Sequence, residues 1–208
     1  MFSWLVCTIL MLSINESFSL SVNKSTFLSK PLSGRTKLTR NSGCGFFLQM
    51  VCEVKIRIVG RKNGSESWIE DGYKMYETRL RPSTVDLITI WHKNNDDLVK
   101  NVLSEDEKGH TIVLLDPLGK KMTSEDFSDS MYKWLESGGS RLTFVIGGAD
   151  GLPEDLRIDI NRKVNHSRSR FQMISLSDLT FTHQFARTLL AEQIYRATEI
   201  RKGSGYHK

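Results

Sequence analysis

Three loops of the sequence carry residue types that suit the binding of a ligand. Residues 147–153 (GGADGLP) follow an apolar run and contain three glycines. Glycine tolerates a positive φ and has no Cβ to block a close approach between backbone and ligand. Residues 115–121 (LDPLGKK) and 175–183 (SLSDLTFTH) have unusual compositions of their own. By itself the glycine loop predicts either a tight turn before a helix or a ligand loop, and the three loops together favour a ligand site.

None of these loops matches a common phosphate-binding motif. Ala149 stands where G-x-G-x-x-G requires its second glycine, and Gly119-Lys120 lacks the glycine five residues upstream that G-x-x-x-x-G-K-[ST] requires. The sequence also contains no H-E-x-x-H, no G-x-S-x-G and no clustered carboxylate pair. These absences weaken the interpretation of the glycine loop as a phosphate cradle, and we predict no metal site.

The elements that must position the loops alternate between strand and helix. Apolar patterns predict strands at 54–60, 85–91, 111–116, 142–146 and 172–177. Predicted helices include one that ends at Pro82, one at 96–107, one with a capping box of Thr123 and Asp126, one with Pro153 in its first turn and one at 183–201. This alternation predicts an α/β fold with a mainly parallel sheet and flanking helices. Such sheets bind ligands outside the carboxyl ends of their strands, where all three loops lie.

The first 52 residues differ in composition from the rest. They contain one acidic residue, five basic residues, nine serines and four threonines, whereas residues 53–208 contain 24 basic and 23 acidic residues. A segment that is rich in hydroxyl groups, basic and poor in acids is typical of an organelle transit peptide. We therefore expect residues 1–52 to be disordered or removed and residues 53–208 to form the folded domain. The expected location is the chloroplast, with the mitochondrion as the alternative.

A secretory signal is the other interpretation of this segment, because residues 4–12 (WLVCTILML) form a short apolar run. No basic residue precedes the run, however, and the basic, serine-rich segment continues to Arg40. The run is also too short to span a bilayer. All three cysteines lie in the segment, at positions 7, 44 and 52. The folded domain can therefore have no disulfide framework, no cysteine-bound zinc and no thiol nucleophile.

Four blocks of the sequence resemble one known family. They are VLLDPLGKKMTSEDF (113–127), FVIGGADGL (144–152), SLSDLTFTHQFARTLLAEQIYRA (175–197) and the terminal YHK (206–208). In this order they are similar to small SPOUT-class methyltransferases, the bacterial RlmH-like family, which modify pseudouridine at N3 in large-subunit ribosomal RNA. The resemblance runs from residue 54 to residue 208, and its most specific part is T-H-x-x-x-R-x-x-x-A-E-x-x-Y-R-A at 182–197.

The resemblance implies methyl transfer from S-adenosylmethionine by a homodimer. Ribosomal RNA, either free or in the assembled ribosome, is the implied partner. The implied fold has its C-terminal part threaded into a deep trefoil knot. The periodicity of the sequence does not predict a knot, because chain connections almost never thread loops, and residues alone would predict an ordinary doubly wound sheet.

Cofactor contacts, carried over by motif, fall on the three loops. They are Leu115, Gly147, Leu176, Ser177, Asp178, Leu179, Thr180 and Phe181. Apolar walls and nearby backbone amides suit an adenine ring, and glycine at position 147 would let the backbone approach the cofactor. Two places depart from the family pattern: Asp178 replaces a small apolar residue, and Ala149-Asp150 replaces a Pro-Glu pair.

Methyl transfer mainly requires that the N3 lone pair be held in line with the sulfonium methyl group, although a base that removes the imide proton would help. The candidates are His183, beside the cofactor loop, and His207 with Tyr206 in the C-terminal tail, which the resemblance places over the partner's site. The alternative for His183 is a helix cap. Arg187 either grips a phosphate or pairs with Glu192. The alternative for the C-terminal tail is a frayed end, as in most proteins.

The nearly balanced charge of residues 53–208 excludes a general polycationic surface, so RNA contacts must be local. The best cluster contains Arg162, Lys163, His166, Arg168 and Arg170, and its alternative is a solvated loop. We expect His92 and His110 to be surface or strand-edge residues without a functional role.

The sequence therefore predicts an organelle-targeted RNA methyltransferase that uses S-adenosylmethionine and acts on pseudouridine in organelle large-subunit ribosomal RNA. One alternative is an enzyme of the same fold that methylates another ribosomal or transfer RNA position. A second alternative is a non-catalytic ribosome-assembly factor. We expect no association with a membrane.

Overall fold

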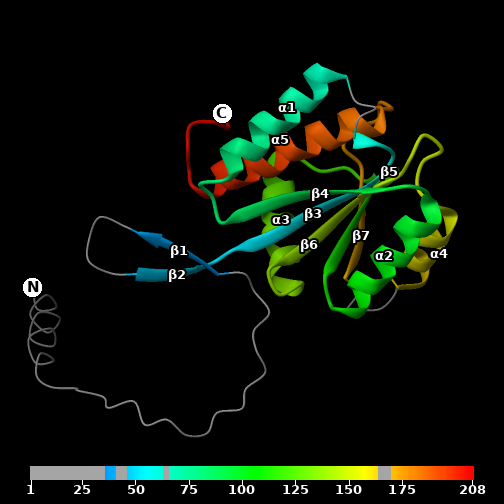
Figure 1. Cartoon of the computed structure of the whole chain (residues 1–208), viewed down its shortest axis with the longest axis horizontal. Coiled ribbons are helices and arrows are strands. Elements are labelled where there is room, and N and C mark those ends of the chain that lie inside the picture. Colours follow the sequence, from blue (N-terminus) through cyan, green and yellow to red (C-terminus); the bar gives the residue numbers. More distant parts are fainter. Residues whose placement is uncertain (1–35, 41–45, 63–65, 164–169) are drawn as a thin grey trace, which may run out of the picture. The chain divides into compact units, whose positions relative to one another are not determined.

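A five-stranded parallel sheet forms the centre of the computed structural model, which describes residues 36–40, 46–62, 66–163 and 170–208 (Figure 1). The strands are β3 (Cys52–Val59), β4 (Val85–His92), β5 (Thr111–Lys120), β6 (Arg141–Ile146) and β7 (Phe171–Ile174). Their order across the sheet is β4-β3-β6-β5-β7, and every neighbouring pair is parallel. The predicted α/β class with a mainly parallel sheet is confirmed.

Among the described residues, five helices cover the two faces of the sheet, as Figure 1 shows. They are α1 (Ser67–Leu80), α2 (Asn95–Glu107), α3 (Ser124–Ser137), α4 (Glu154–Lys163) and α5 (His183–Arg201). The side chains of α1, α3 and α5 share one apolar core with the sheet, and those of α2 and α4 share a second core on its other face. The central strand β6 serves both cores, because Phe144 belongs to the first and Val145 to the second. A continuous apolar run such as this one is typical of a strand buried on both faces.

Short polar side chains set the beginnings of the helices. The hydroxyl oxygen of Thr182 accepts a hydrogen bond from the Phe185 amide at the start of α5, and Thr123 does the same for Asp126 at the start of α3. Such N-caps satisfy amide groups that a first turn leaves unpaired. Pro153 lies one residue before α4 rather than in its first turn, and its carbonyl oxygen accepts hydrogen bonds from the next turn.

Two strand ends differ from the prediction. Strand β5 continues to Lys120 instead of ending at 116, and β7 ends at Ile174 instead of 177. The two ends meet, because Lys120 is paired with Ile174 beyond a shift in register. A Cβ on Gly119 would overlap the Ile174 backbone, so this close crossing of the two chain segments requires glycine.

Two further strands lie within the segment that we expected to be a targeting peptide. Strands β1 (Thr36–Arg40) and β2 (Phe46–Met50) pair in an antiparallel manner. The composition of residues 1–52 did not predict them, because a bias toward basic and hydroxyl residues carries no pattern with a period of two.

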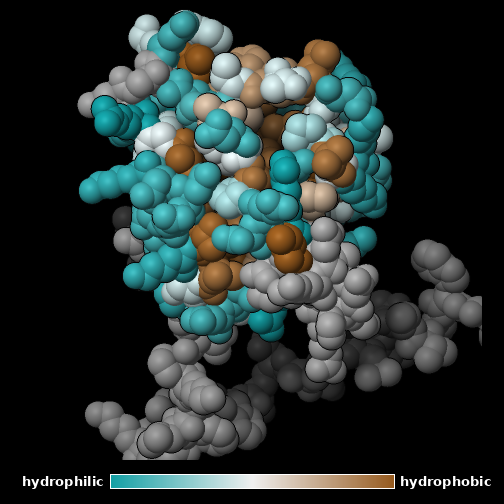
Figure 2. All heavy atoms as spheres, turned by 90° about the vertical axis from the view of Figure 1, so that its right-hand side faces the viewer, coloured by the Kyte–Doolittle hydropathy of each residue, from teal (hydrophilic) through white to brown (hydrophobic). Residues whose placement is uncertain are grey.

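The described helices and the surface of the protein can be compared with what a bilayer would require. No described helix is both long and apolar enough to cross a bilayer. On the face shown in Figure 2, apolar residues form separate patches within a mainly hydrophilic surface.

A buried ionic cluster joins α2 to the sheet. The side chain of Glu105 accepts hydrogen bonds from Arg57 (2.9 Å), Lys55 (3.1 Å) and Thr143 (2.6 Å), although the residue is only 3% exposed. Burial alone would raise the pKa of Glu105, but the hydrogen bonds from Arg57 and Thr143 and the charge of Arg57 hold this pKa at about 2. The carboxylate is therefore ionised and fully partnered inside the protein.

The two histidines expected at the surface or a strand edge lie beside this cluster. His92 ends the edge strand β4, and His110 directly precedes β5, but both are buried. The Nε2 atom of His92 accepts a hydrogen bond from the Arg57 guanidinium (2.9 Å), so its Nδ1–H donates to Asp97 (2.8 Å). The alternative of a strand edge holds for His92, whereas surface exposure is wrong for both residues, because contacts across the sheet bury them although their sequence neighbours are polar.

We expect the substitution Glu105→Ala to lower the free energy of unfolding by about 3–5 kcal/mol at pH 7, because it leaves Arg57 buried without its carboxylate partner. The exposed Glu107 at the end of α2 provides a matched control, for which Glu107→Ala should change the free energy by less than about 0.5 kcal/mol. Urea titration measures both values. The folded pKa of Glu105 lies below its ordinary value of 4.5, so its contribution should be complete above pH 4.5 and fade as the pH falls toward 2. Equal stability of the two variants would contradict this account.

Candidate functional site

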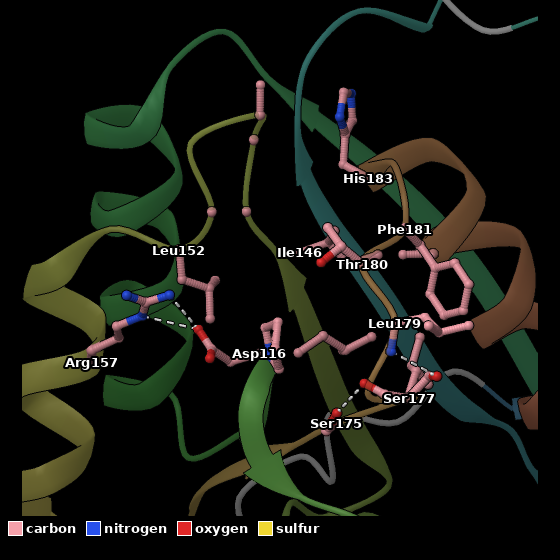
Figure 3. Close-up of a pocket in the computed structure, with 18 residues that line it drawn as sticks. Asp116, Ile146, Leu152, Arg157, Ser175, Ser177, Leu179, Thr180, Phe181 and His183 are labelled. Carbon is pink, nitrogen blue, oxygen red and sulfur yellow. Dashed lines mark hydrogen bonds and ion pairs between the residues drawn. The ribbon is translucent and has the colours of Figure 1, made fainter.

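One pocket collects the loops at the carboxyl ends of β5, β6 and β7 (Figure 3). Its lining comprises Leu115, Asp116, Pro117, Ile146, Gly147, Gly148, Ala149, Gly151, Leu152, Arg157, Ser175, Leu176, Ser177, Leu179, Thr180, Phe181, His183 and Ala186. The three loops that the sequence analysis selected therefore meet at one place. The rule for parallel sheets located this place correctly because all five strands point toward the same edge.

Seven of the eight predicted cofactor residues line this pocket. They are Leu115, Gly147, Leu176, Ser177, Leu179, Thr180 and Phe181. Asp178 is not among the lining residues; its side chain is 74% exposed and forms an ion pair with Lys121 from the loop after β5. The structure thus gathers the predicted residues around one cavity, and their contact with a cofactor stays a prediction.

Gly147 has a reason to be glycine that the sequence did not reveal. A Cβ at this position would overlap the backbone of Gly151 and Leu152. The loop folds back on itself there, because Gly148 and Gly151 form an isolated antiparallel bridge and the Gly151 amide donates to the Gly148 carbonyl (3.1 Å). Gly151 has a φ of 82°, which favours glycine. The sequence predicts that residue 147 is glycine because a cofactor approaches its backbone. The packing of the loop is sufficient by itself to require glycine at this position.

Serine side chains shape the third loop of the pocket. The Ser175 hydroxyl donates a hydrogen bond to the Ser177 carbonyl oxygen (2.8 Å), and the Leu179 amide donates to the Ser177 hydroxyl oxygen (3.1 Å). These local bonds make a turn that leaves Leu179 71% exposed at the pocket. The loop then continues through Phe181, whose ring packs edge-on against Phe185 of α5.

His183 lies at the start of α5 and borders the same pocket. A Cβ on Gly60, which has a φ of 140°, would lie 3.1 Å from the Nε2 atom of His183, so glycine makes room for the ring. Burial lowers the pKa of His183 below its ordinary value of 6.5, and the ring is therefore neutral at pH 7 and able to accept a proton. The alternative that His183 caps the helix is wrong, because Thr182 supplies the cap.

An ion pair that no sequence motif predicted lies in the pocket wall. Asp116, which is 4% exposed, accepts two hydrogen bonds at Oδ2 from Arg157 of α4. Its Oδ1 atom accepts a third bond from the Leu118 amide (2.9 Å). The position of Asp116 directly after an apolar strand was a signal that could have been used, whereas nothing local to Arg157 indicates its partner 41 residues away.

Arg187 is enclosed in the protein core rather than placed in the pocket. The residue is 1% exposed, its guanidinium lies 4.0 Å from the centre of the Tyr73 ring, and it forms an ion pair with Glu70 of α1. The predicted pairing with Glu192 is wrong, because Glu192 is bound to Arg196 one turn further along α5. To grip a phosphate, Arg187 would have to leave these partners.

The C-terminal tail is held against its own chain, so the alternative of a frayed end is wrong. The Tyr206 hydroxyl donates to Glu192 (3.2 Å). His207 bridges two helices, because its Nδ1 accepts from Arg196 (3.2 Å) and its Nε2–H donates to Glu125 (2.7 Å). Neither Tyr206 nor His207 lines the pocket of its own chain, and their action on a partner's pocket stays a prediction.

Most of the predicted basic cluster lies outside the part of the chain whose side chains are described. Of its members only Arg170 has a described side chain, and it is exposed just before β7. No group of three or more histidine, cysteine or acidic side chains placed to hold a metal ion occurs among the described residues.

Comparison with known proteins gives one consistent family. A family model described as a predicted SPOUT methyltransferase matches residues 52–207. A protein of Protochlamydia amoebophila named ribosomal RNA large subunit methyltransferase H is 44% identical over 155 residues, which cover 74% of this chain and 99% of that protein. Proteins of the same name from Prochlorococcus marinus and a Synechococcus species are 36% and 33% identical, and each alignment covers 74% of this chain and 96% of the relative.

We expect Gly147→Ala to lower the free energy of unfolding by about 1–3 kcal/mol, because the added methyl group must displace the Gly151 backbone. Gly205→Ala is the control, since a Cβ there would have nothing within 4 Å, and it should leave stability unchanged. Thermal unfolding followed by circular dichroism compares the two variants. If Gly147→Ala were as stable as the control, the packing explanation for this glycine would fail.

Proposed function

The chain belongs to the SPOUT methyltransferase family, and we propose that it methylates large-subunit ribosomal RNA with S-adenosylmethionine as the methyl donor. The observation that carries this proposal is the pocket that unites the loops after β5, β6 and β7, where seven of the eight residues implied by the family motifs lie. The relatives named ribosomal RNA large subunit methyltransferase H match almost over their whole length, which supports the same class of substrate for this chain.

The walls of the pocket fit the cofactor. Ile146, Leu176, Leu179 and Phe181 provide apolar surface around an adenine ring, and the loop amides offer hydrogen bonds. When bound, S-adenosylmethionine supplies an electrophilic methyl group, so the protein has mainly to exclude water and align the two reacting groups. The apolar walls and the tightly folded glycine turn suit that task.

We propose that the acceptor is N3 of a pseudouridine and that His183 receives the imide proton. Its ring lies at the pocket, and burial keeps the ring neutral at pH 7 by lowering its pKa. A neutral imidazole beside the acceptor would contribute about 10²–10⁴-fold to the rate as a general base.

Arg61 and Lys62 support an RNA-binding role for this edge. Both are exposed, and they directly follow Gly60, which packs against the His183 ring. Because the folded domain as a whole is nearly neutral, we propose that this local pair binds the phosphates near the target nucleotide.

We further propose that the protein acts as a homodimer whose C-terminal part forms a trefoil knot. In this arrangement the tail with Tyr206 and His207 closes over the pocket of the partner. The dimer would explain why these two residues of the family motif lie outside the pocket of their own chain.

The proposed reaction is tested by incubating the full chain with S-adenosylmethionine and unmodified large-subunit ribosomal RNA. Mass spectrometry of the digested RNA should show one methyl-pseudouridine, and His183→Ala should lower kcat by about 10²–10⁴-fold. Lys133→Ala on the exposed side of α3 is the control and should leave kcat unchanged. A methyl group at another RNA position, including transfer RNA, would favour the alternative substrate. Cofactor binding without any methyl transfer would contradict the proposed activity, and absence of cofactor binding would favour an assembly factor.

We also propose that residues 1–52 direct the protein to the chloroplast, with the mitochondrion as the alternative organelle. Their basic, acid-poor composition supports this. Residues 1–52 fused to a fluorescent protein should accumulate in plastids of photosynthetic cells, whereas the fluorescent protein alone should not. Mitochondrial fluorescence would select the alternative organelle, and fluorescence in the secretory pathway would refute the organelle address.

A further inference from the structure

We propose that the ion pair of Asp116 and Arg157 binds the amino-acid end of S-adenosylmethionine and so fixes the direction in which the cofactor lies. This inference rests on the proposed function, since it concerns the same pocket. It assigns a role to two residues that are not among the cofactor contacts carried over from the family motifs.

The geometry of the pair leaves hydrogen-bonding capacity for a ligand. Nε and Nη2 of Arg157 both donate to one oxygen, Oδ2 of Asp116, at 2.9 Å and 2.6 Å. Nη1 donates to no residue that the structure describes. The Asp116 side chain is 2% exposed, whereas that of Arg157 is 41% exposed. The buried Asp116 carboxylate thus holds the guanidinium through Nε and Nη2, and the edge of the guanidinium that carries Nη1 remains accessible to a ligand.

The pair lies apart from the apolar part of the pocket. In Figure 3, Arg157 and Asp116 stand on one side, next to Leu152, while Phe181 and His183 stand on the other. The lining therefore has a charged end and an apolar end. S-adenosylmethionine has the same division, because its adenine prefers apolar walls and its amino-acid part carries an ammonium and a carboxylate group.

Charge complementarity selects the amino-acid end. A guanidinium binds carboxylates through charge-assisted hydrogen bonds, and the Asp116 carboxylate attracts an ammonium group. A ligand group with one charge of each sign matches a protein pair that is itself neutral, so no net charge is buried on binding. A phosphate would match Arg157 alone and would be repelled by Asp116.

The turn around Asp116 makes the position of the pair rigid. Oδ1 of Asp116 accepts from the Leu118 amide, and this bond fixes the irregular part of β5 between Leu115 and Lys120. The pair also joins this part of β5 to α4, because Arg157 projects from the first turns of that helix. A rigid anchor of this kind costs little conformational entropy when the ligand binds.

The experiment compares two ligands that differ in the proposed contact. S-adenosylhomocysteine retains the amino-acid end, whereas 5′-methylthioadenosine lacks it. Isothermal titration calorimetry of the full chain at pH 7 should show tighter binding of S-adenosylhomocysteine. The substitution Arg157→Met should weaken that ligand by about tenfold to a hundredfold, the usual value of a hydrogen bond to a charged group. Binding of 5′-methylthioadenosine should change by less than about twofold.

Two further variants separate binding from folding. Arg157→Lys keeps the positive charge and should restore part of the lost affinity. Arg81→Met removes an exposed arginine beyond the end of α1 and should leave both affinities unchanged. Because 5′-methylthioadenosine still reports an intact pocket, a variant that fails to fold would lose both ligands and be recognised.

The outcomes distinguish this proposal from the proposed function. Equal affinity of the wild-type chain for the two ligands, or an equal effect of Arg157→Met on both, would overturn the assignment of the pair while leaving cofactor binding established. If inorganic phosphate bound to the chain and competed with neither ligand, Arg157 would be an anion site apart from the cofactor, and the assignment would again be wrong. Failure of the wild-type chain to bind either ligand would instead overturn the proposed function, and this inference with it.

Discussion

The common direction of the five strands is the constraint on which the rest of this structure depends. Because every strand is parallel to its neighbours, all carboxyl ends lie at one edge of the sheet, and the loops after β5, β6 and β7 must meet there. Strand β6 occupies the middle of the sheet and is held by a separate apolar core on each face. The glycine loop that follows β6 is therefore positioned by a strand that is buried on both faces. A pocket built on such strand ends is more rigid than one built from loops alone.

The protein contains two ion pairs of similar chemistry in different surroundings. Arg57 and Glu105 are closed off, with side chains 8% and 3% exposed, and further polar groups complete the coordination of the carboxylate. Asp116 is equally buried, but the side chain of its partner Arg157 is 41% exposed and faces the pocket. The closed pair is buried out of reach of a ligand, and its role is to join α2 to β3. The open pair is the one that a ligand can reach.

The parts of the structure that depend on local sequence pattern could be predicted from the sequence. Apolar periodicity predicted the five strands of the main sheet and the helices between them, and the rule for parallel sheets placed the pocket. Contacts between distant residues were not predictable. Arg187 pairs with Glu70, 117 residues away, and lies over the rings of Tyr73 and Trp91; no local spacing indicates such partners. The burial of His92 and His110 was not predicted for the same reason, since burial depends on elements that are far apart along the chain.

Gly147 lines the pocket, but a ligand is not needed to explain why this residue is glycine. Its lack of a side chain suggested a close approach of the cofactor, but the neighbouring backbone of Gly151 and Leu152 already excludes a Cβ. A glycine that the fold itself requires is no independent sign of a ligand. Arg157 and His183 give the same pocket two polar side chains that are not fully buried. The Arg157 side chain is 41% exposed and the His183 ring is partly exposed, so a ligand in the cavity can reach both groups. Their convergence on one cavity supports the proposed ligand site more than the glycines do.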